Sequence, residues 1–346
     1  MPAEYVPPES RLPDSPATQR SWEANGGWAA EALRLLQLPG PWIRLVAGLA
    51  FVLMVLATAT RVSPPTALSG VRRSNSGQPW TARAASISPD RYAWLTKRQA
   101  KAYASLADRI ETPEGWTRVK ASPGSFAAWL RHLPVAPEEA PVKSGKGKVV
   151  LPAADPSLAA VIALQPHSDR LLAGPNMLIR LRAEYVWSSG RLSDLGFHFT
   201  NGDFAAWERW EAGDRPTVRG REVSWSKVLE PDESRTNYCA YLESLFQYSS
   251  GYSLLADTTE VRDGSIAAGD IFLRNGRESC SLIVVDAATS KEGRLAVLIG
   301  RSDWPAQSFH IVRCSDGSAW APVAQNRDLA LTNGLTARLQ DLRRWK

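Results

Sequence analysis

The fold is decided by two stretches of the chain, TNYCAYLESLFQYSSGYSLL at residues 236–255 and GDIFLRNGRESCSLIVVDA at residues 269–287. In the first stretch, apolar residues recur at helical spacing behind Cys239, and in the second, two short apolar runs flank a polar turn. This order predicts a helix led by a cysteine and packed on a pair of strands. A thiol at the N-terminus of a helix is stabilised as thiolate by the helix dipole, so the pattern is typical of a thiol hydrolase.

The composition indicates a globular chain without nucleic-acid or metal chemistry. Of 346 residues, 44% are hydrophobic and 22% are charged, which is enough apolar material for one large domain. The net charge of +6 is spread thinly, and there is no zinc-finger spacing and no glycine-rich phosphate loop, so we expect no nucleic-acid partner. The three cysteines show no CxxC spacing, so we expect neither a metal site nor a cofactor.

An apolar run near the N-terminus, LVAGLAFVLMVLATA, predicts a membrane anchor. The run is uncharged and long enough, with its flanks, to cross a bilayer, so we predict a transmembrane signal anchor over residues 41–60. A cleaved signal peptide and a buried core helix are the alternatives. We expect a disordered arm over residues 1–40, a linker over residues 61–88 and a folded domain over residues 89–346 that lies outside the cytoplasm.

Hydrophobic periodicity predicts that the folded domain is of the α+β class. Short alternating runs indicate strands, and longer runs with a 3.6-residue period indicate helices. Trp207 and Trp210 lie three residues apart on one predicted helix, where they form either part of the core or a platform for a sugar. The predicted helices cover Tyr92–Ile110, Ser122–Leu133, Met177–Trp187 and Phe204–Glu211.

Several motifs, taken in order, resemble one bacterial family. They are PEGWTRVKASPGSFAAWLRHLP, IRLRAEYVWSSG, FHFTNGDFAAW, VSWSK, GDIFL, LIVVDA and WPAQSFHI, and they fall between about Tyr92 and Pro322. On these motifs the chain resembles the family named domain of unknown function 4846. The resemblance implies a class of protein and no chemistry, because that family has no activity attached to its name.

The C-terminal part is similar to the NlpC-like papain-fold peptidases, which cut bacterial cell-wall peptides. The matching features are Cys239 at the head of a helix, Gly251 twelve residues later and a GD strand that begins at Gly269. This resemblance implies a papain-like C-terminal half with Cys239 as the nucleophile. The peptidases carry a histidine at the head of the next strand, where this chain has Cys280. A papain-type site needs an imidazole to hold the thiolate and to protonate the leaving amine, so the dyad is broken.

The broken dyad leaves three interpretations of Cys239. In the first, which we expect, Cys239 is a small buried hydrophobe in a domain that has lost catalysis and binds an envelope glycan, peptide or protein partner. In the second, Cys239 is the nucleophile of a hydrolase of cell-wall peptides and takes its base from elsewhere, with His310 as the candidate. In the third, Cys239 and Cys280 face each other and form a disulfide.

Polar residues near the predicted strand ends are the candidate cleft residues. In a papain-like fold a ligand would lie where strands end beside the cysteine helix. Arg301 takes the position at which the peptidases use a polar orienting residue, and a guanidinium cannot accept a hydrogen bond. The full set is Asp270, Cys280, Asp286, Arg301, Asp303 and Trp304.

Overall fold

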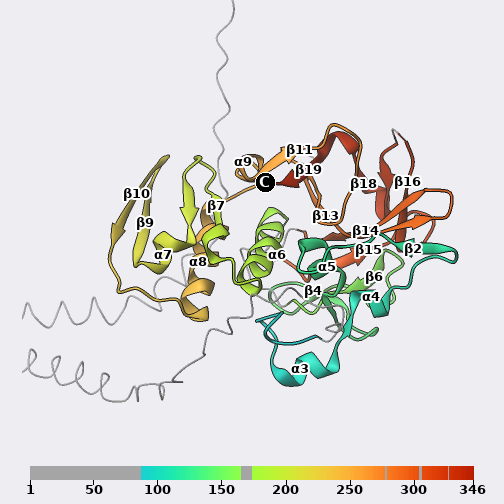
Figure 1. The fold of residues 1–346 in the computed structure, drawn as a ribbon, viewed down its shortest axis with the longest axis horizontal. Helices are drawn as coiled ribbons and strands as arrows, with labels where there is room; N and C mark the ends of the chain where they lie inside the picture. Colours follow the sequence, from blue (N-terminus) through green and yellow to red (C-terminus); the bar gives the residue numbers. More distant parts are fainter. Residues whose placement is uncertain (1–86, 165–173, 277–278, 304–305, 326) are drawn as a thin grey trace, which may run out of the picture. The chain divides into compact units, whose positions relative to one another are not determined.

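A nine-stranded antiparallel sheet organises the part of the chain that the computed structural model describes, residues 87–346 without 165–173, 277–278, 304–305 and 326 (Figure 1). Seven strands form a continuous row, and two more pair with its central strands. In order, the row is β11 (Thr258–Glu260), β19 (Leu342–Trp345), β12 (Ile271–Arg274), β13 (Cys280–Ser290), β14 (Leu295–Arg301), β15 (His310–Val312) and β6 (Leu158–Val161), with β16 (Trp320–Val323) beside β14 and β2 (Trp116–Arg118) beside β13.

Strand β13 is central to the sheet because its sequence gives it two apolar faces. Ile283 and Val285 belong to the core on one face, whereas Leu282 and Val284 belong to the core on the other. All four side chains are at most 1% exposed. The pairing with β14 shifts register between Val284 and Asp286, which marks a β-bulge. A strand that is apolar on both sides needs a cover on both sides, and the rest of the domain supplies the two covers.

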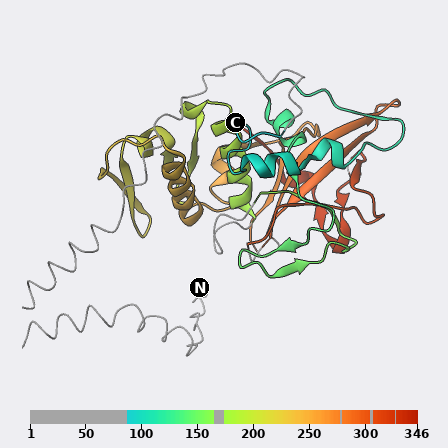
Figure 2. The same cartoon turned by 90° about the horizontal axis from the view of Figure 1, so that it is seen from below.

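Helices cover the first face. α5 (Phe126–Arg131) and α6 (Pro175–Ser188) contact β13, while α8 (Arg235–Tyr248) packs on α6 and on α7 (Trp207–Glu211). Both views show α6 between α8 and the sheet (Figure 1, Figure 2). The first hydrophobic core therefore extends from the sheet through α6 to α8.

The C-terminal segment covers the second face of the sheet. Its two-stranded sheet of β17 (Leu329–Ala330) and β18 (Thr336–Ala337) contributes Leu329 and Ala337 to a second hydrophobic core, which also contains Cys314. This second core shares no buried residue with the first. Side chains on opposite faces of β13 thus lie in separate apolar environments.

The remaining elements are short. Most of the small strands form local pairs, namely β1 with β3, β4 with β5, β7 with β8 and β9 with β10. The bounds are α3 (Lys97–Ala102), β1 (Ala104–Ser105), α4 (Leu106–Arg109), β3 (Pro134–Val135), β4 (Val142–Lys143), β5 (Val149–Leu151), η1 (Leu192–Asp194), β7 (Gly196–His198), β8 (Phe204–Ala206), β9 (Asp214–Arg219), β10 (Glu222–Lys227), α9 (Leu254–Asp257), η2 (Thr332–Gly334) and η3 (Leu339–Asp341).

The predicted helices are confirmed where the apolar period is long and are wrong where it is interrupted. The helix predicted over Met177–Trp187 is confirmed as α6. The single helix predicted over Tyr92–Ile110 is wrong, because Tyr103 is extended (φ −101°, ψ 140°) and the chain forms α3, β1 and α4. Ser105 then starts α4 as its N-cap, with its hydroxyl accepting from the N–H of Asp108.

Two other helix predictions are confirmed only over part of their length. The helix predicted over Ser122–Leu133 is α5, which begins after the N-cap Ser125. Of the helix predicted over Phe204–Glu211, the first three residues are strand β8 and the rest is α7. Trp207 and Trp210 are buried in the first core, so the core interpretation of this pair is confirmed and the sugar platform is wrong.

The mixture of helices with antiparallel sheet confirms the α+β class. All described residues fall in one compact unit, Asn75–Lys346. The predicted arm over 1–40, the predicted anchor over 41–60 and nearly all of the predicted linker over 61–88 lie outside the described residues. Within the described range, no helix is long and apolar enough to cross a membrane.

Candidate functional site

Cys239 does not open its helix. α8 begins at Arg235, four residues before Cys239, and its N-cap is Ser234, whose hydroxyl accepts from the N–H of Asn237. The favourable field of a helix N-terminus falls off within the first turn. Cys239 thus lies beyond the region in which the helix dipole stabilises a thiolate, and this part of the sequence prediction is wrong.

The surroundings of Cys239 favour the neutral thiol. The side chain is partly buried against the first core, and burial raises its pKa above the ordinary value, an effect that Arg235 opposes and Glu184 reinforces. Glu184 itself is 2% exposed and accepts from Arg235 Nη2 at 2.7 Å, with Arg180 Nε at 3.8 Å. The positive charge near the thiol is therefore engaged by a buried carboxylate. A thiol in such a place is a poor nucleophile at neutral pH.

The described parts of the chain bring neither an imidazole nor Cys280 to Cys239. The charged groups that act on Cys239 are Arg235, Glu184, Arg180 and Glu243, without a histidine. Cys280 belongs to the second core, whereas Cys239 packs against the first. Both cysteines, like Cys314, are free thiols. The structure thus does not show the disulfide of the third interpretation.

Asp270 and Asp286 are buried carboxylates that form ion pairs. Asp270 is 1% exposed and accepts from Arg344 through two nitrogens, Nε and Nη2, each at 2.7 Å. Asp286 is fully buried and accepts from Arg131 through Nε at 2.8 Å and Nη2 at 2.7 Å. Both carboxylates join distant segments of the chain, which is a structural role.

Three of the predicted site residues, Arg301, Asp303 and His310, do meet in one cavity of about 160 Å³. We name it the Arg301 cavity. It lies beside β5, where β14 ends and β15 begins, and Trp304 lies outside the described residues. Its walls are formed by Val150, Leu151, Ser157, Arg301, Asp303, Gln307, His310, Val312, Thr332 and Asn333.

Sheet register explains why these residues meet. Arg301 pairs with His310 across β14 and β15, and with Leu282 across β14 and β13. Directly paired residues project on the same face, so Arg301 and His310 both lie on the face of the second core. Cys280 is two residues before Leu282 on that face, and Arg301 and Asp303 are among the charges that act on it, although burial dominates and raises its pKa. Cys280 thus lies close to the cavity without lining it.

His310 is a neutral hydrogen-bonding group in this wall. It is 3% exposed, and its Nδ1 lies 3.0 Å from the carbonyl oxygen of Ser308. A carbonyl oxygen only accepts, so Nδ1 carries the proton and Nε2 is left as an acceptor. Burial lowers the pKa of His310 below its ordinary value, which keeps the ring neutral at pH 7.

Seven further residues of the Arg301 cavity were missed from the sequence, among them Gln307 and Asn333. Gln307 is 4% exposed, and its Oε1 accepts no hydrogen bond from any part of the chain that the structure describes. The Nε of Arg301 is also buried, and it donates no hydrogen bond to any part of the chain that the structure describes. Asn333 has φ 60° and is, among the described residues, the one non-glycine with positive φ. Strained backbone of this kind is concentrated at functional sites. The available signal for Gln307 was its place in WPAQSFH, between Asp303 and His310.

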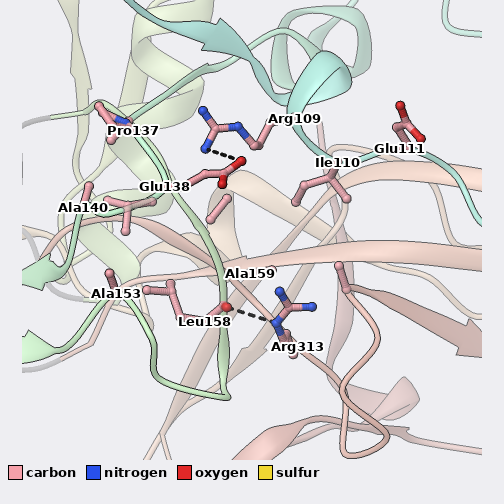
Figure 3. A pocket seen from close by; sticks show the side chains of 14 residues that line it. Arg109, Ile110, Glu111, Pro137, Glu138, Ala140, Ala153, Leu158, Ala159 and Arg313 are labelled. Atoms are coloured by element: carbon pink, nitrogen blue, oxygen red, sulfur yellow. Dashed lines mark hydrogen bonds and ion pairs between the residues drawn. The ribbon is translucent and has the colours of Figure 1, made fainter.

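A larger cavity of about 450 Å³ borders the edge strand β6 (Figure 3). Its wall combines small residues, mostly alanines, with two glutamates and two arginines, and both arginines are engaged by the protein. Arg109 lies 3.7 Å from Glu138, and Arg313 donates through Nε to the carbonyl oxygen of Leu158 at 3.0 Å and through Nη1 to that of Gly317. None of the residues predicted for the site lines this cavity. The Arg301 cavity is therefore the better candidate.

The described residues contain no group of three or more His, Cys, Asp and Glu side chains that could hold a metal ion. A family model described as domain of unknown function (4846) matches residues 106–344, more than half of the chain and all of the Arg301 cavity. No curated protein and no solved structure matches the chain. The match confirms the family resemblance that the motifs indicated.

Proposed function

The chain belongs to the family domain of unknown function (4846), and we propose that it is an envelope protein that binds a cell-wall glycan or peptide without cleaving it. In this proposal residues 41–60 anchor the chain in the membrane and the domain lies outside the cytoplasm. The proposal also includes a papain-like origin of the C-terminal half, which the order of Cys239, Gly251 and the GD strand supports.

The observation that carries the binding function is the Arg301 cavity. Arg301, Asp303 and His310, a basic, an acidic and an imidazole side chain, line this one concave site together with Gln307. Converging polar groups in a concave site are the usual mark of ligand binding.

The state of Cys239 argues against the alternative function, a cysteine hydrolase. The thiol is neutral, lies on the second turn of α8 and has no described imidazole beside it. His310, the base suggested by the sequence, faces the second core, and Cys239 packs against the first. A hydrolase would need both groups within hydrogen-bond reach.

Co-sedimentation with purified peptidoglycan sacculi tests the proposal. We expect the full chain in detergent to bind saturably and Arg301→Met to weaken binding about tenfold or more, because a charge-assisted hydrogen bond contributes about 1.5–3 kcal/mol. The matched control is Arg294→Met, since Arg294 is 69% exposed on a hairpin and should leave binding unchanged. Cys239→Ala should also bind like the natural chain.

Two results would overturn the proposal. Absence of the natural chain from the sacculus pellet would remove the binding function. Release of cell-wall peptides by the natural chain, lost in Cys239→Ala, would establish the hydrolase in its place.

A further inference from the structure

The cavity of about 450 Å³ that borders β6, which we name the β6 cavity, contains an arginine without a counter-ion. Arg313 donates through Nε to the carbonyl oxygen of Leu158 and through Nη1 to that of Gly317, each at 3.0 Å, and it forms no ion pair with the described parts of the chain. Its third nitrogen, Nη2, has no acceptor among the described residues and remains accessible to solvent. A partly buried guanidinium that is paired only with neutral oxygens favours an anion beside it.

The acidic residues of the wall do not supply this anion. Figure 3 shows the Arg109 guanidinium above the hollow and the Arg313 guanidinium below it, whereas the Glu111 carboxylate points away from both. Glu138 lies 3.7 Å from Arg109, and its side chain is 78% exposed, so water screens its charge. Arg109 donates no hydrogen bond to the described residues. The inside of the cavity is therefore positive, which favours an anionic group on the ligand.

The rest of the wall favours an extended peptide. Six of the fourteen wall residues are alanines, whose small side chains leave the neighbouring backbone uncovered. Leu158–Val161 is β6, the last strand of the row, and no described strand pairs with its outer side. The preceding segment reaches the end of β6, where the N–H of Ala136 donates to the carbonyl oxygen of Val161, and then turns away at Pro137. An open strand edge of this kind can pair with the backbone of an added peptide.

We propose that the β6 cavity binds a short extended peptide by its C-terminal carboxylate, which accepts from Nη2 of Arg313. A planar guanidinium matches the shape of a carboxylate. The volume is about three times that of a cavity of about 150 Å³ that holds one benzene ring, which leaves room for two or three residues with small side chains. The β6 cavity shares no wall residue with the Arg301 cavity, so this second site goes beyond the proposed function.

Calorimetry on the full chain in detergent, at constant ionic strength, tests the ligand chemistry. The ligands are trialanine, trialanine amide, which lacks the carboxylate, and hexanoate, which lacks the peptide groups. We expect trialanine to bind about tenfold or more tightly than either, because each of the others loses one set of hydrogen bonds. Equal affinity of trialanine and its amide would overturn the inference, and equal affinity of hexanoate would overturn the assignment to a peptide. Tighter binding of inorganic phosphate than of trialanine would also overturn it.

Two variants with matched controls connect the binding to this cavity. Arg313→Met removes the partner of the carboxylate and should weaken trialanine binding about tenfold or more, whereas Arg98→Met, at an exposed position on α3, should not. Ala153→Leu narrows the cavity, keeps Arg313 with its two hydrogen bonds and should weaken binding by a similar factor of about ten. Its control is Ala154→Leu, the adjacent exposed alanine, which does not line the cavity. Unchanged affinity in both Arg313→Met and Ala153→Leu would overturn the inference.

Arg301→Met separates this inference from the proposed function. It changes the other cavity, so we expect weaker binding to sacculi and an unchanged affinity for trialanine. Loss of trialanine binding in Arg301→Met would place the peptide in the Arg301 cavity and overturn this inference. If the natural chain binds trialanine but does not sediment with sacculi, the proposed function fails and the peptide site stands. If it sediments with sacculi but does not bind trialanine, the reverse holds.

Discussion

Asp286 is the carboxylate whose loss should damage the fold most. It is fully buried, and Arg131 donates two hydrogen bonds to its Oδ1 while Arg118 Nη1 lies 3.4 Å from its Oδ2. The N–H of Ala287 also donates to Oδ1. Arg131 and Arg118 are 155 and 168 residues away in sequence, so this one side chain joins β13 to α5 and to β2. Asp286→Asn therefore tests whether the network stabilises the domain.

The structure sets the size of the expected effect. Asp286→Asn keeps the shape of the side chain but removes its charge and turns one acceptor into a donor that faces an arginine. Removal of one partner from a buried ion pair costs about 3–5 kcal/mol. The side chains of Arg131 and Arg118 are 14% and 18% exposed, so water partly solvates them once the carboxylate is gone. We expect a loss near the lower end, about 3 kcal/mol.

Urea denaturation of the full chain in detergent, followed by tryptophan fluorescence, measures this loss. With a slope of about 3 kcal/mol per M, the midpoint of Asp286→Asn should fall by about 1 M. The control is Asp194→Asn, which breaks the exposed pair of Asp194 with Arg191 at 3.5 Å and should cost roughly 0–1 kcal/mol. A midpoint for Asp286→Asn that equals the control would refute the structural role. If Asp286→Asn instead lost ligand binding while its stability stayed unchanged, Asp286 would be a residue of the binding site.

Two further predictions concern protonation and thiols. Burial lowers the pKa of His310 and of His132 from 6.5, so below pH 6.5 the unfolded chain binds more protons than the folded one, and the free energy of unfolding should fall as pH decreases. His310→Gln should reduce that slope, and an unchanged slope would contradict the assignment. A thiol titration of the unreduced chain in denaturant should count three thiols, and in native buffer Cys239 should react before the more buried Cys280 and Cys314; a count of one would reveal a disulfide.

Local signals in the sequence predicted the fold where they agreed with each other. α6 was predicted because its apolar period is continuous and ends near Gly190. The break between α3 and α4 was missed although its signals were present. Thr96 and Gln99 form a capping box, and Ser105 caps α4 in front of Asp108. The apolar period across Tyr92–Ile110 predicts one helix, but the caps at Thr96 and Ser105 determine the structure.

The site was predicted only in part because long-range pairing creates it. Arg301 and His310 meet through the register of β14 and β15, which no local pattern contains. Val150 and Leu151 complete the wall from a segment about half the chain away, and Gln307 lies in a loop without helical or strand periodicity. A carboxylate such as Asp270 reads the same in sequence whether it lines a cleft or pairs with a distant arginine. The ion pair with Arg344, 74 residues away, gives Asp270 its structural role, and this pairing cannot be seen in the sequence.

The separation of Cys239 from Cys280 gives the binding hypothesis its physical basis. Cys239 packs against the helical core, where burial and Glu184 disfavour a thiolate, and catalysis would need that charge. The polar groups of the cavity are instead on the other face of β13, around Arg301 and His310. Recognition there needs only fixed donors and acceptors, and the sheet holds them in place without any contribution from a thiol. A domain of this arrangement can keep the Cys239 helix for packing and still bind a ligand. The packing of Cys239 and the binding of the ligand would involve opposite faces of β13.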